Sequence, residues 1–244
     1  RIHGPEQVIH AVSQARAGGF ENINLDLMFG LPGQSLEESR CDVEVAIELE
    51  PEHISYYQLT IEPNTQFAVS PPVLPSDERL WDIQQQGQAL LDDGGYRQYE
   101  ISAYSMADKQ CRHNLNYWNF GDYLGIGAGA HGKISDSENQ RVRRRSRVRG
   151  PALYLKHAGS KQALSGDVYI NEQSLMLEFM MNLLRLNAGF NEALFQDRTG
   201  VLCARVQPIL LKAQQRGLLQ LDCDRLKPTQ LGHRYLNDLL GLFV

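Results

Sequence analysis

The sequence predicts an α/β fold in residues 1–165, followed by a small, mostly helical domain in residues 166–244. Two observations support this prediction. In the first part, segments with helical spacing of apolar residues alternate with segments of strand-like alternation. After Gly166 the pattern becomes purely helical apart from one short hairpin. A helix, strand, helix, strand order is typical of proteins built on a parallel sheet.

The first predicted helix begins at Pro5 and stops at Gly18-Gly19, where the chain enters a strand. In this strand the apolar residues at odd-numbered positions alternate with Asn24 and Asp26. Successive side chains of a strand point to opposite faces, so the pattern predicts one apolar face and one polar face. Asn24 and Asp26 are therefore expected to share the polar face.

A loop and a helix follow this strand. Glycine and proline residues break the strand over residues 30–33, and Ser35 with Glu38 fits a capping box that opens a helix. In α/β proteins ligands collect at the carboxyl ends of parallel strands. We therefore expect a ligand beside Asp26 and the 30–33 backbone, although the glycines are explained equally well by the turn alone.

The α/β part continues with four further predicted segments. The second helix ends before Pro51, and Ile54–Ile61 reads as the next strand. Residues 62–75 form a loop that is long enough to be functional, and a helix runs from about Asp77 to Gly94-Gly95. Residues Tyr96–Tyr104 are predicted to be extended.

The segment Cys111–Trp118 combines two aromatic side chains with an imidazole, amides and a guanidinium group. It has little helical or strand period, which predicts a loop that holds a ligand. The alternative is structural: Tyr117 and Trp118 would be ordinary core aromatics, and His113 a hydrogen-bonded spacer.

Two further segments are candidates for ligand contacts. Tyr123–Gly132 carries alternate glycines, which allow a ligand or another backbone to approach closely. Residues Arg141–Arg149 contain six arginines in nine residues. This run has three possible interpretations: a site for a polyanion, a solvent-exposed strand, or guanidinium groups that bind the carboxylates of an acidic ligand.

The C-terminal part has the element order of a winged-helix domain. Predicted helices cover Leu175–Leu184 and Val201–Gln215, with a short helix capped by Asn191 between them. A hairpin then leads to Thr229, which caps the last helix. Such domains often bind DNA, but they also serve as plain packing domains.

Composition excludes several classes of protein. The chain has 24 Lys and Arg against 29 Asp and Glu, and its net charge of -5 argues against non-specific nucleic-acid binding. With neither a membrane span nor a signal peptide in the pattern, we expect a cytoplasmic location. The four cysteines have no C-x-x-C spacing and indicate neither disulfides nor a self-contained metal site. Because the chain begins with Arg1 rather than Met, we expect a longer parent protein.

Five segments, in this order, resemble the oxygen-independent coproporphyrinogen III oxidase-like branch of the radical SAM superfamily, and most closely its heme chaperone members. The His-Asn-x-x-Tyr-Trp motif is the most specific of them, and the resemblance spans essentially the whole chain. The five segments are Asn24–Gln34, Tyr57–Thr65, Tyr99–Ser102, His113–Trp118 and Tyr123–His131.

This resemblance implies the C-terminal part of a radical SAM partial (β/α) barrel, followed by a small winged-helix-like domain. Family members hold S-adenosylmethionine (SAM) and a 4Fe-4S cluster in the barrel. The family's three cysteines, spaced C-x3-C-x2-C, and its glycine-rich SAM loop do not occur in this chain. The resemblance assigns both to a preceding N-terminal part of the barrel.

The resemblance also implies functional residues by position. Those that match SAM contacts of the family are Arg1, Asp26, Thr60 and His131. Those that match the heme-binding motif are His113, Asn114, Tyr117 and Trp118, with His113 as the candidate ligand of the heme iron. The residue types agree with this role, because imidazole is a common axial ligand of heme iron and aromatic rings pack on porphyrin faces.

Three functions compete on this basis. The favoured one is a heme chaperone that binds heme and delivers it to heme-accepting respiratory proteins, because the oxidases lack the His-Asn-x-x-Tyr-Trp motif at this place. The alternative is an oxygen-independent coproporphyrinogen III oxidase, which decarboxylates propionates in porphyrin biosynthesis by radical SAM chemistry. The remote alternative is a winged-helix DNA-binding protein. No nucleic-acid partner is expected, and the sequence leaves open whether the chain forms a homodimer.

Overall fold

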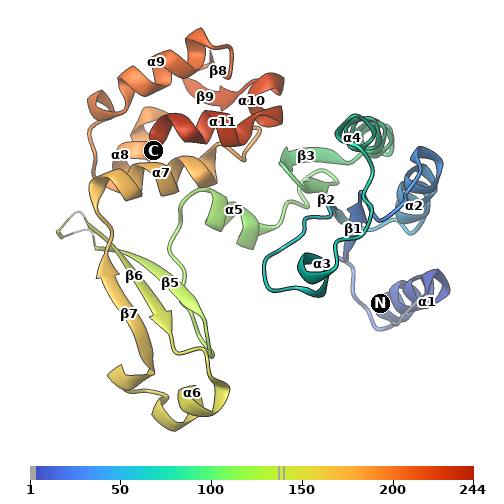
Figure 1. The fold of residues 1–244 in the computed structure, drawn as a ribbon, viewed down its shortest axis with the longest axis horizontal. Coiled ribbons are helices and arrows are strands. Elements are labelled where there is room, and N and C mark those ends of the chain that lie inside the picture. The colour runs from blue at the N-terminus through green and yellow to red at the C-terminus, as the bar shows by residue number, and fades with distance from the viewer. Residues whose placement is uncertain (1–3, 137, 140) are drawn as a thin grey trace. The chain divides into compact units, whose positions relative to one another are not determined.

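The computed structural model describes residues 4–136, 138–139 and 141–244, and these fold into two compact units that divide between Cys111 and Arg112 (Figure 1). The boundary expected after residue 165 falls inside strand β7 (Leu164–Tyr169) of the second unit. This strand pairs with β6 (Arg141–Arg147) across the expected boundary. The change in sequence character therefore marks the start of the C-terminal helices, and the compact unit begins earlier.

The first unit is a mixed sheet with helices packed against it. The strand order is β1-β2-β4-β3, in which β1 is parallel to β2 and the other pairs are antiparallel. The parallel pair was predicted, whereas residues 96–104 form a hairpin rather than one extended segment. The elements are α1 (Pro5–Ala17), β1 (Asn24–Phe29), α2 (Leu36–Glu48), β2 (His53–Gln58), α3 (Gln66–Val69), α4 (Asp77–Asp93), β3 (Arg97–Glu100) and β4 (Ala103–Ser105).

Strand β1 has the two faces that its sequence predicts. Leu25, Leu27 and Phe29 belong to the apolar core of the first unit, whereas Asn24 and Asp26 are exposed. The same core takes residues from α2 and α4, which pack on one another. Burial of the apolar face against these helices is what fixes the polar face outward.

The loop between β1 and α2 is closed by hydrogen bonds to side chains. The Gln34 side-chain oxygen accepts the backbone N–H groups of Gly30, at 2.8 Å, and Leu31, at 3.2 Å. Ser35 Oγ accepts the Glu38 N–H at 3.2 Å, and the Glu38 carboxylate accepts the Ser35 N–H at 2.8 Å, which confirms the predicted capping box. Gly30 has a φ of 73°, and a Cβ there would lie 2.7 Å from Leu80, so this turn needs glycine.

The second unit combines a three-stranded antiparallel sheet, ordered β5-β6-β7, with a helical region that carries the hairpin β8-β9 (Figure 1). Helix α6 lies at one end of the sheet (Figure 1). The elements are α5 (Arg112–Trp118), β5 (His131–Asp136), β6, α6 (Pro151–His157), η1 (Lys161–Ala163), β7, α7 (Glu172–Leu183), α8 (Glu192–Thr199), η2 (Cys203–Arg205), α9 (Gln207–Gln215), β8 (Leu219–Asp222), β9 (Arg225–Pro228), α10 (Gln230–Arg234), α11 (Leu236–Leu240) and η3 (Gly241–Phe243).

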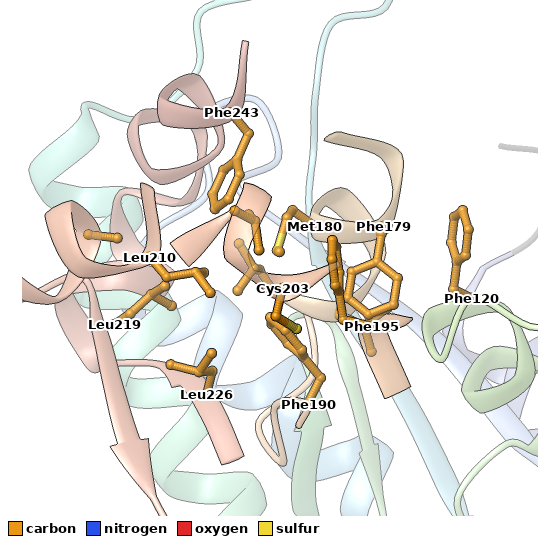
Figure 2. Close-up of a cluster of buried hydrophobic side chains, with 14 of the residues drawn as sticks. Phe120, Phe179, Met180, Phe190, Phe195, Cys203, Leu210, Leu219, Leu226 and Phe243 are labelled. Carbon is orange, nitrogen blue, oxygen red and sulfur yellow. The ribbon is translucent and has the colours of Figure 1, made fainter. Parts of the chain in front are cut away.

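Aromatic side chains make up the centre of the second core (Figure 2). The ring of Phe179 is fully buried and lies 5.2 Å from Phe190 and 5.1 Å from Phe195 between centroids, in edge-to-face contacts. Phe120, which follows α5, contacts the same ring at 5.6 Å. This core therefore anchors the chain at the end of α5.

The predicted C-terminal elements are present, with two differences. Asn191 caps α8 and Thr229 caps α10, as predicted, and the hairpin forms over residues 219–228. The helix predicted from Val201 starts only at Gln207, after a 3-10 turn. The last helix is divided at Tyr235 into α10 and α11. Among the described helices, none has the length and apolar character needed to cross a membrane.

Candidate functional site

Residues Arg112–Trp118, predicted to be a loop, form the short helix α5. Its seven residues make about two turns, too few for a helical period to stand out in the sequence. Leu115 and Trp118, three positions apart, pack against the second core and hold the helix there. His113 and Tyr117, four positions apart, are exposed with their ring centroids 6.5 Å from each other.

Tyr117 is the centre of a group of aromatic rings. Its ring centroid lies 5.4 Å from that of Trp118 and 4.7 Å from that of Tyr123, and its hydroxyl donates to the Tyr123 hydroxyl at 3.2 Å. Burial is the main cause that raises the pKa of Tyr123 to about 12. The side chain of Tyr117 itself keeps 36% of its surface exposed, so the group presents a ring to the solvent.

Trp118 links this group to α7 and the segment that follows it. The guanidinium carbon of Arg185 lies 4.3 Å from the Trp118 ring centroid, a cation–π distance. The Trp118 Nε1 atom is buried and has no hydrogen-bond partner among the described residues. A buried N–H without an acceptor is costly, which makes this atom a candidate contact for a ligand. Asn114, on the same helix, is half-buried.

The glycine-rich loop after α5 is fixed to β5 by a buried lysine. Lys133 donates to the Phe120 carbonyl at 2.9 Å and pairs with Asp122 at 3.3 Å. Burial lowers the pKa of Lys133, partly offset by Asp122. Burial would raise the pKa of Asp122, but hydrogen bonds from Ser135 and then the charge of Lys133 outweigh it and lower this pKa. These contacts place Tyr123 beside Tyr117.

The residues expected to contact SAM fall in both units. Asp26 is exposed on β1, where its carboxylate accepts a hydrogen bond from Asn24 at 2.9 Å. Thr60 is exposed just after β2 and donates to Glu62 at 3.2 Å. His131 is exposed at the start of β5 in the second unit, and Arg1 lies outside the described residues. Within the first unit, Asp26 therefore lies on β1, and Thr60 lies just beyond the end of the neighbouring parallel strand β2.

A polar network behind Asp26 was not predicted. His53 is buried, its Nδ1 lies 2.6 Å from Asn24 Oδ1, and its Nε2 lies 2.8 Å from the Tyr99 hydroxyl. Ser55 donates to the same Asn24 oxygen at 3.1 Å. Because Asn24 also donates to Asp26, this network fixes the orientation of the Asp26 carboxylate. The sequence signals only the polar face that carries Asn24, since the partners are far apart along the chain.

Most of the arginine run lies in strand β6 (Arg141–Arg147), and acidic partners neutralise part of its charge. Arg143 and Arg145 pair with Asp167 of β7, and Arg144 pairs with Glu178 of α7 at 2.6 Å. The hydrogen bond from Arg143 is the main cause that lowers the pKa of Asp167. Among the described residues there is no cluster of three or more His, Cys, Asp and Glu side chains suited to a metal ion.

Comparison with known proteins identifies relatives along the whole chain. Residues 170–235 match the model of the HemN C-terminal domain. The full chain is 46% identical to the heme chaperone HemW of Escherichia coli and 45% identical to that of Haemophilus influenzae, and it covers 63% and 62% of their lengths. The heme chaperone HemW of Bacillus subtilis is 32% identical, with 64% of its length covered. The chain thus spans less than two thirds of these relatives.

A solved structure shares the fold. The coproporphyrinogen III oxidase HemN from Escherichia coli, described as a radical SAM enzyme, superimposes with a TM-score of 0.75 and 20% sequence identity. The match covers 100% of this chain and 59% of the HemN chain. The likeness confirms the predicted α/β class of the fold.

Proposed function

Because the chain belongs over its full length to the family of the HemW proteins, we propose that it is part of a heme chaperone and that α5 binds the heme. The observation that carries this proposal is the exposed pair His113 and Tyr117 on one face of α5, beside Trp118. The relatives of 45 and 46% identity are named heme chaperones, which supports the same function here.

The residues of α5 fit heme in three respects. The His113 imidazole is exposed and therefore accessible to the iron of a heme, and imidazole is a common axial ligand of heme iron. The exposed Tyr117 ring can pack on a porphyrin face, with the Tyr123 ring 4.7 Å behind it as support. The buried Trp118 Nε1 offers a hydrogen-bond donor that has no acceptor among the described residues.

Each of these residues would make a different contact with the heme. His113 would supply the bond to iron, Tyr117 and Trp118 would cover one face of the ring, and Asn114 would contribute a polar contact. Since α5 is a surface helix, a heme bound there stays within reach of ligands on an acceptor protein. Delivery to heme-accepting respiratory proteins then requires only that the acceptor binds heme more tightly.

For the first unit, we propose the C-terminal part of a radical SAM partial barrel. Its parallel strands β1 and β2, joined by α2, have the connection that builds (β/α) barrels. Asp26 on β1 and Thr60 just beyond β2 would contact SAM. The Asp26 carboxylate suits a ribose hydroxyl or the amino acid end of SAM.

Two further features of this proposal concern the C-terminal domain and the cluster. The match to the HemN C-terminal domain over residues 170–235 supports a winged-helix-like domain in residues 166–244. Cys41, Cys111, Cys203 and Cys223 stand in no cluster-like spacing. A 4Fe-4S cluster in the parent protein would therefore take its cysteine ligands from residues outside this chain.

Heme titration followed by transfer tests the function. The chain should bind about one heme, and addition of an apoprotein with a higher heme affinity should move the heme to that acceptor. Tyr117→Leu and Trp118→Leu should each weaken binding, while Phe67→Leu, an exposed aromatic of the first unit, serves as the control. Binding of many hemes per chain, equally in all variants, would refute a specific site.

A further inference from the structure

Four arginines share one face of β6. Alternate residues of a strand point to the same side, which places Arg141, Arg143, Arg145 and Arg147 together. On the neighbouring strands, Asp167 and Asp136 occupy positions directly opposite members of this set. The face thus carries four positive charges against two negative ones, in a chain whose net charge is -5.

A cavity of about 250 Å³ adjoins this face. Its lining includes Arg145, Arg147 and the loop segment 123–126. Backbone packing keeps the loop close to β5, because a Cβ on Gly125 would lie 2.3 Å from the His131 carbonyl oxygen. In the same loop, Leu124 and Ile126 expose 75% and 83% of their surface to solvent. Two large aliphatic side chains so exposed beside two guanidinium groups suit a ligand with an apolar body and an acidic edge.

The cavity is joined to α5 by a shared residue. Tyr123 lines the cavity, and its hydroxyl accepts the hydrogen bond from Tyr117. A flat ligand that packs on Tyr117 can therefore extend to the loop that carries Leu124. The cavity is too small for a whole tetrapyrrole, so it would take the edge of the ring and its substituents.

The geometry of the ion pairs leaves Arg145 suited to this role. Arg143 engages both carboxylate oxygens of Asp167, at 2.5 and 2.6 Å, whereas Arg145 reaches the same carboxylate only through Nε at 3.4 Å. Arg147 likewise uses Nε, to the Gly125 carbonyl at 3.3 Å. Among the described residues, both guanidinium groups make their hydrogen bonds through Nε, which leaves the Nη atoms for a carboxylate that arginine can bind in a bidentate manner.

We propose that Arg145 and Arg147 bind the two propionate carboxylates of the tetrapyrrole whose ring packs on α5, with Leu124 and Ile126 against the ring edge. This inference rests on the proposed heme binding and names the contacts that distinguish a dicarboxylate from its neutral ester. Phosphate backbones suit the site less well, because aliphatic side chains line it and the chain as a whole is acidic.

The test compares heme with its dimethyl ester, and metal-free protoporphyrin with its own dimethyl ester, by fluorescence quenching or absorbance titration. The wild-type chain should bind each diacid about tenfold or more tightly than the ester, since only the diacid offers carboxylates for charge-assisted hydrogen bonds. The R145Q/R147Q variant should lose this preference and leave ester binding unchanged. Arg205→Gln, which removes an ion pair to Glu172 elsewhere in the unit, should keep the preference.

The outcomes separate the inference from the function it rests on. Equal binding of diacid and ester by the wild type, or a preference that survives R145Q/R147Q, would overturn the inference while heme binding stands. Failure of the wild type to bind any tetrapyrrole would overturn both. Salt-sensitive binding of duplex DNA that is lost in R145Q/R147Q, without any preference for diacids, would assign the face to phosphates and also overturn it.

A second variant keeps the test decisive if the arginine variant fails to fold. Leu124→Gln with Ile126→Gln changes two exposed side chains, so the fold should persist, as circular dichroism will check. This variant should weaken the diacid and the ester by the same factor, because it alters the apolar contact only. Unchanged affinity for both ligands would contradict the inference.

Discussion

The hydroxyl groups of Tyr117 and Tyr123 lie 3.2 Å apart, and their ring centroids are 4.7 Å apart. This contact joins helix α5 to the glycine-rich loop, which Lys133 and Asp122 hold on the sheet of the second unit. The proposed heme motif and the cavity beside β6 therefore form one continuous surface within that unit.

The burial of Tyr123 predicts an altered titration of this residue. Its pKa is raised to about 12, mainly by burial. Tyrosine ionisation can be followed by ultraviolet absorbance in the wild type and in Tyr123→Phe. The difference between the two titration curves should show one phenol that ionises with a midpoint near this value. In a Tyr117→Phe background the midpoint should also stay above 10, the ordinary value, because burial is the largest cause of the shift. A midpoint at the ordinary value in both backgrounds would contradict the burial of the Tyr123 hydroxyl.

His53 predicts an acid sensitivity of the first unit. Burial lowers the pKa of His53 from its ordinary value of 6.5, against the charges of Glu100 and Asp26. The unfolded chain therefore takes up a proton at a higher pH than the folded chain. The contribution of neutral His53 to the free energy of unfolding is therefore fully present above pH ~6.5, and it is lost as the pH falls through the pKa of His53 in the folded protein.

Urea unfolding at neutral and mildly acidic pH measures this effect. His53→Gln keeps a buried polar side chain and should remove part of the pH dependence, whereas His10→Gln, at an exposed position, should retain it. An unchanged pH dependence in His53→Gln would show that other groups cause the acid sensitivity.

Much of the fold follows from signals that lie within a few residues of one another. The two faces of β1, the cap at Ser35 and the caps at Asn191 and Thr229 were all predicted correctly. Each depends on alternation along one strand or on a side chain that reaches a backbone N–H three residues away. These features can therefore be predicted from a few neighbouring residues alone.

The features that were missed depend on distant partners or on short segments. The His53 to Tyr99 hydrogen bond joins residues 46 positions apart, and no local pattern indicates it. Helix α5 has only seven residues and is held by the second core, so tertiary packing rather than helical period decides its structure. The candidate heme residues could be named from the resemblance, but their grouping around Tyr117 could not.

Asp26 is predicted to matter for ligand binding and little for folding. It is exposed, and Asp26→Asn retains an oxygen that can accept from Asn24, so the unfolding free energy should change by about 0.5 kcal/mol or less. SAM affinity, measured by calorimetry on a parent protein that binds SAM, should fall, while Glu21→Gln should leave it unchanged. A large loss of stability with unchanged affinity would make Asp26 a structural residue.

Phe179 is predicted to be a main source of stability in the second unit. Its ring is fully buried and contacts Phe120, Phe190 and Phe195. Phe179→Ala should lower the free energy of unfolding by about 3–5 kcal/mol, whereas Leu211→Ala, with 48% of its surface exposed, should have a much smaller effect. Chemical denaturation followed by circular dichroism measures both, and similar losses in the two variants would contradict the assigned core.

The most direct test of the proposed heme site is the Soret spectrum of the heme-bound chain in three histidine variants. His113→Ala should shift the Soret band and weaken binding, because it removes the proposed axial ligand. His131→Ala and His157→Ala should retain the wild-type spectrum and affinity, since neither residue lies on α5. The same spectrum and the same affinity in all three variants would contradict heme ligation by His113.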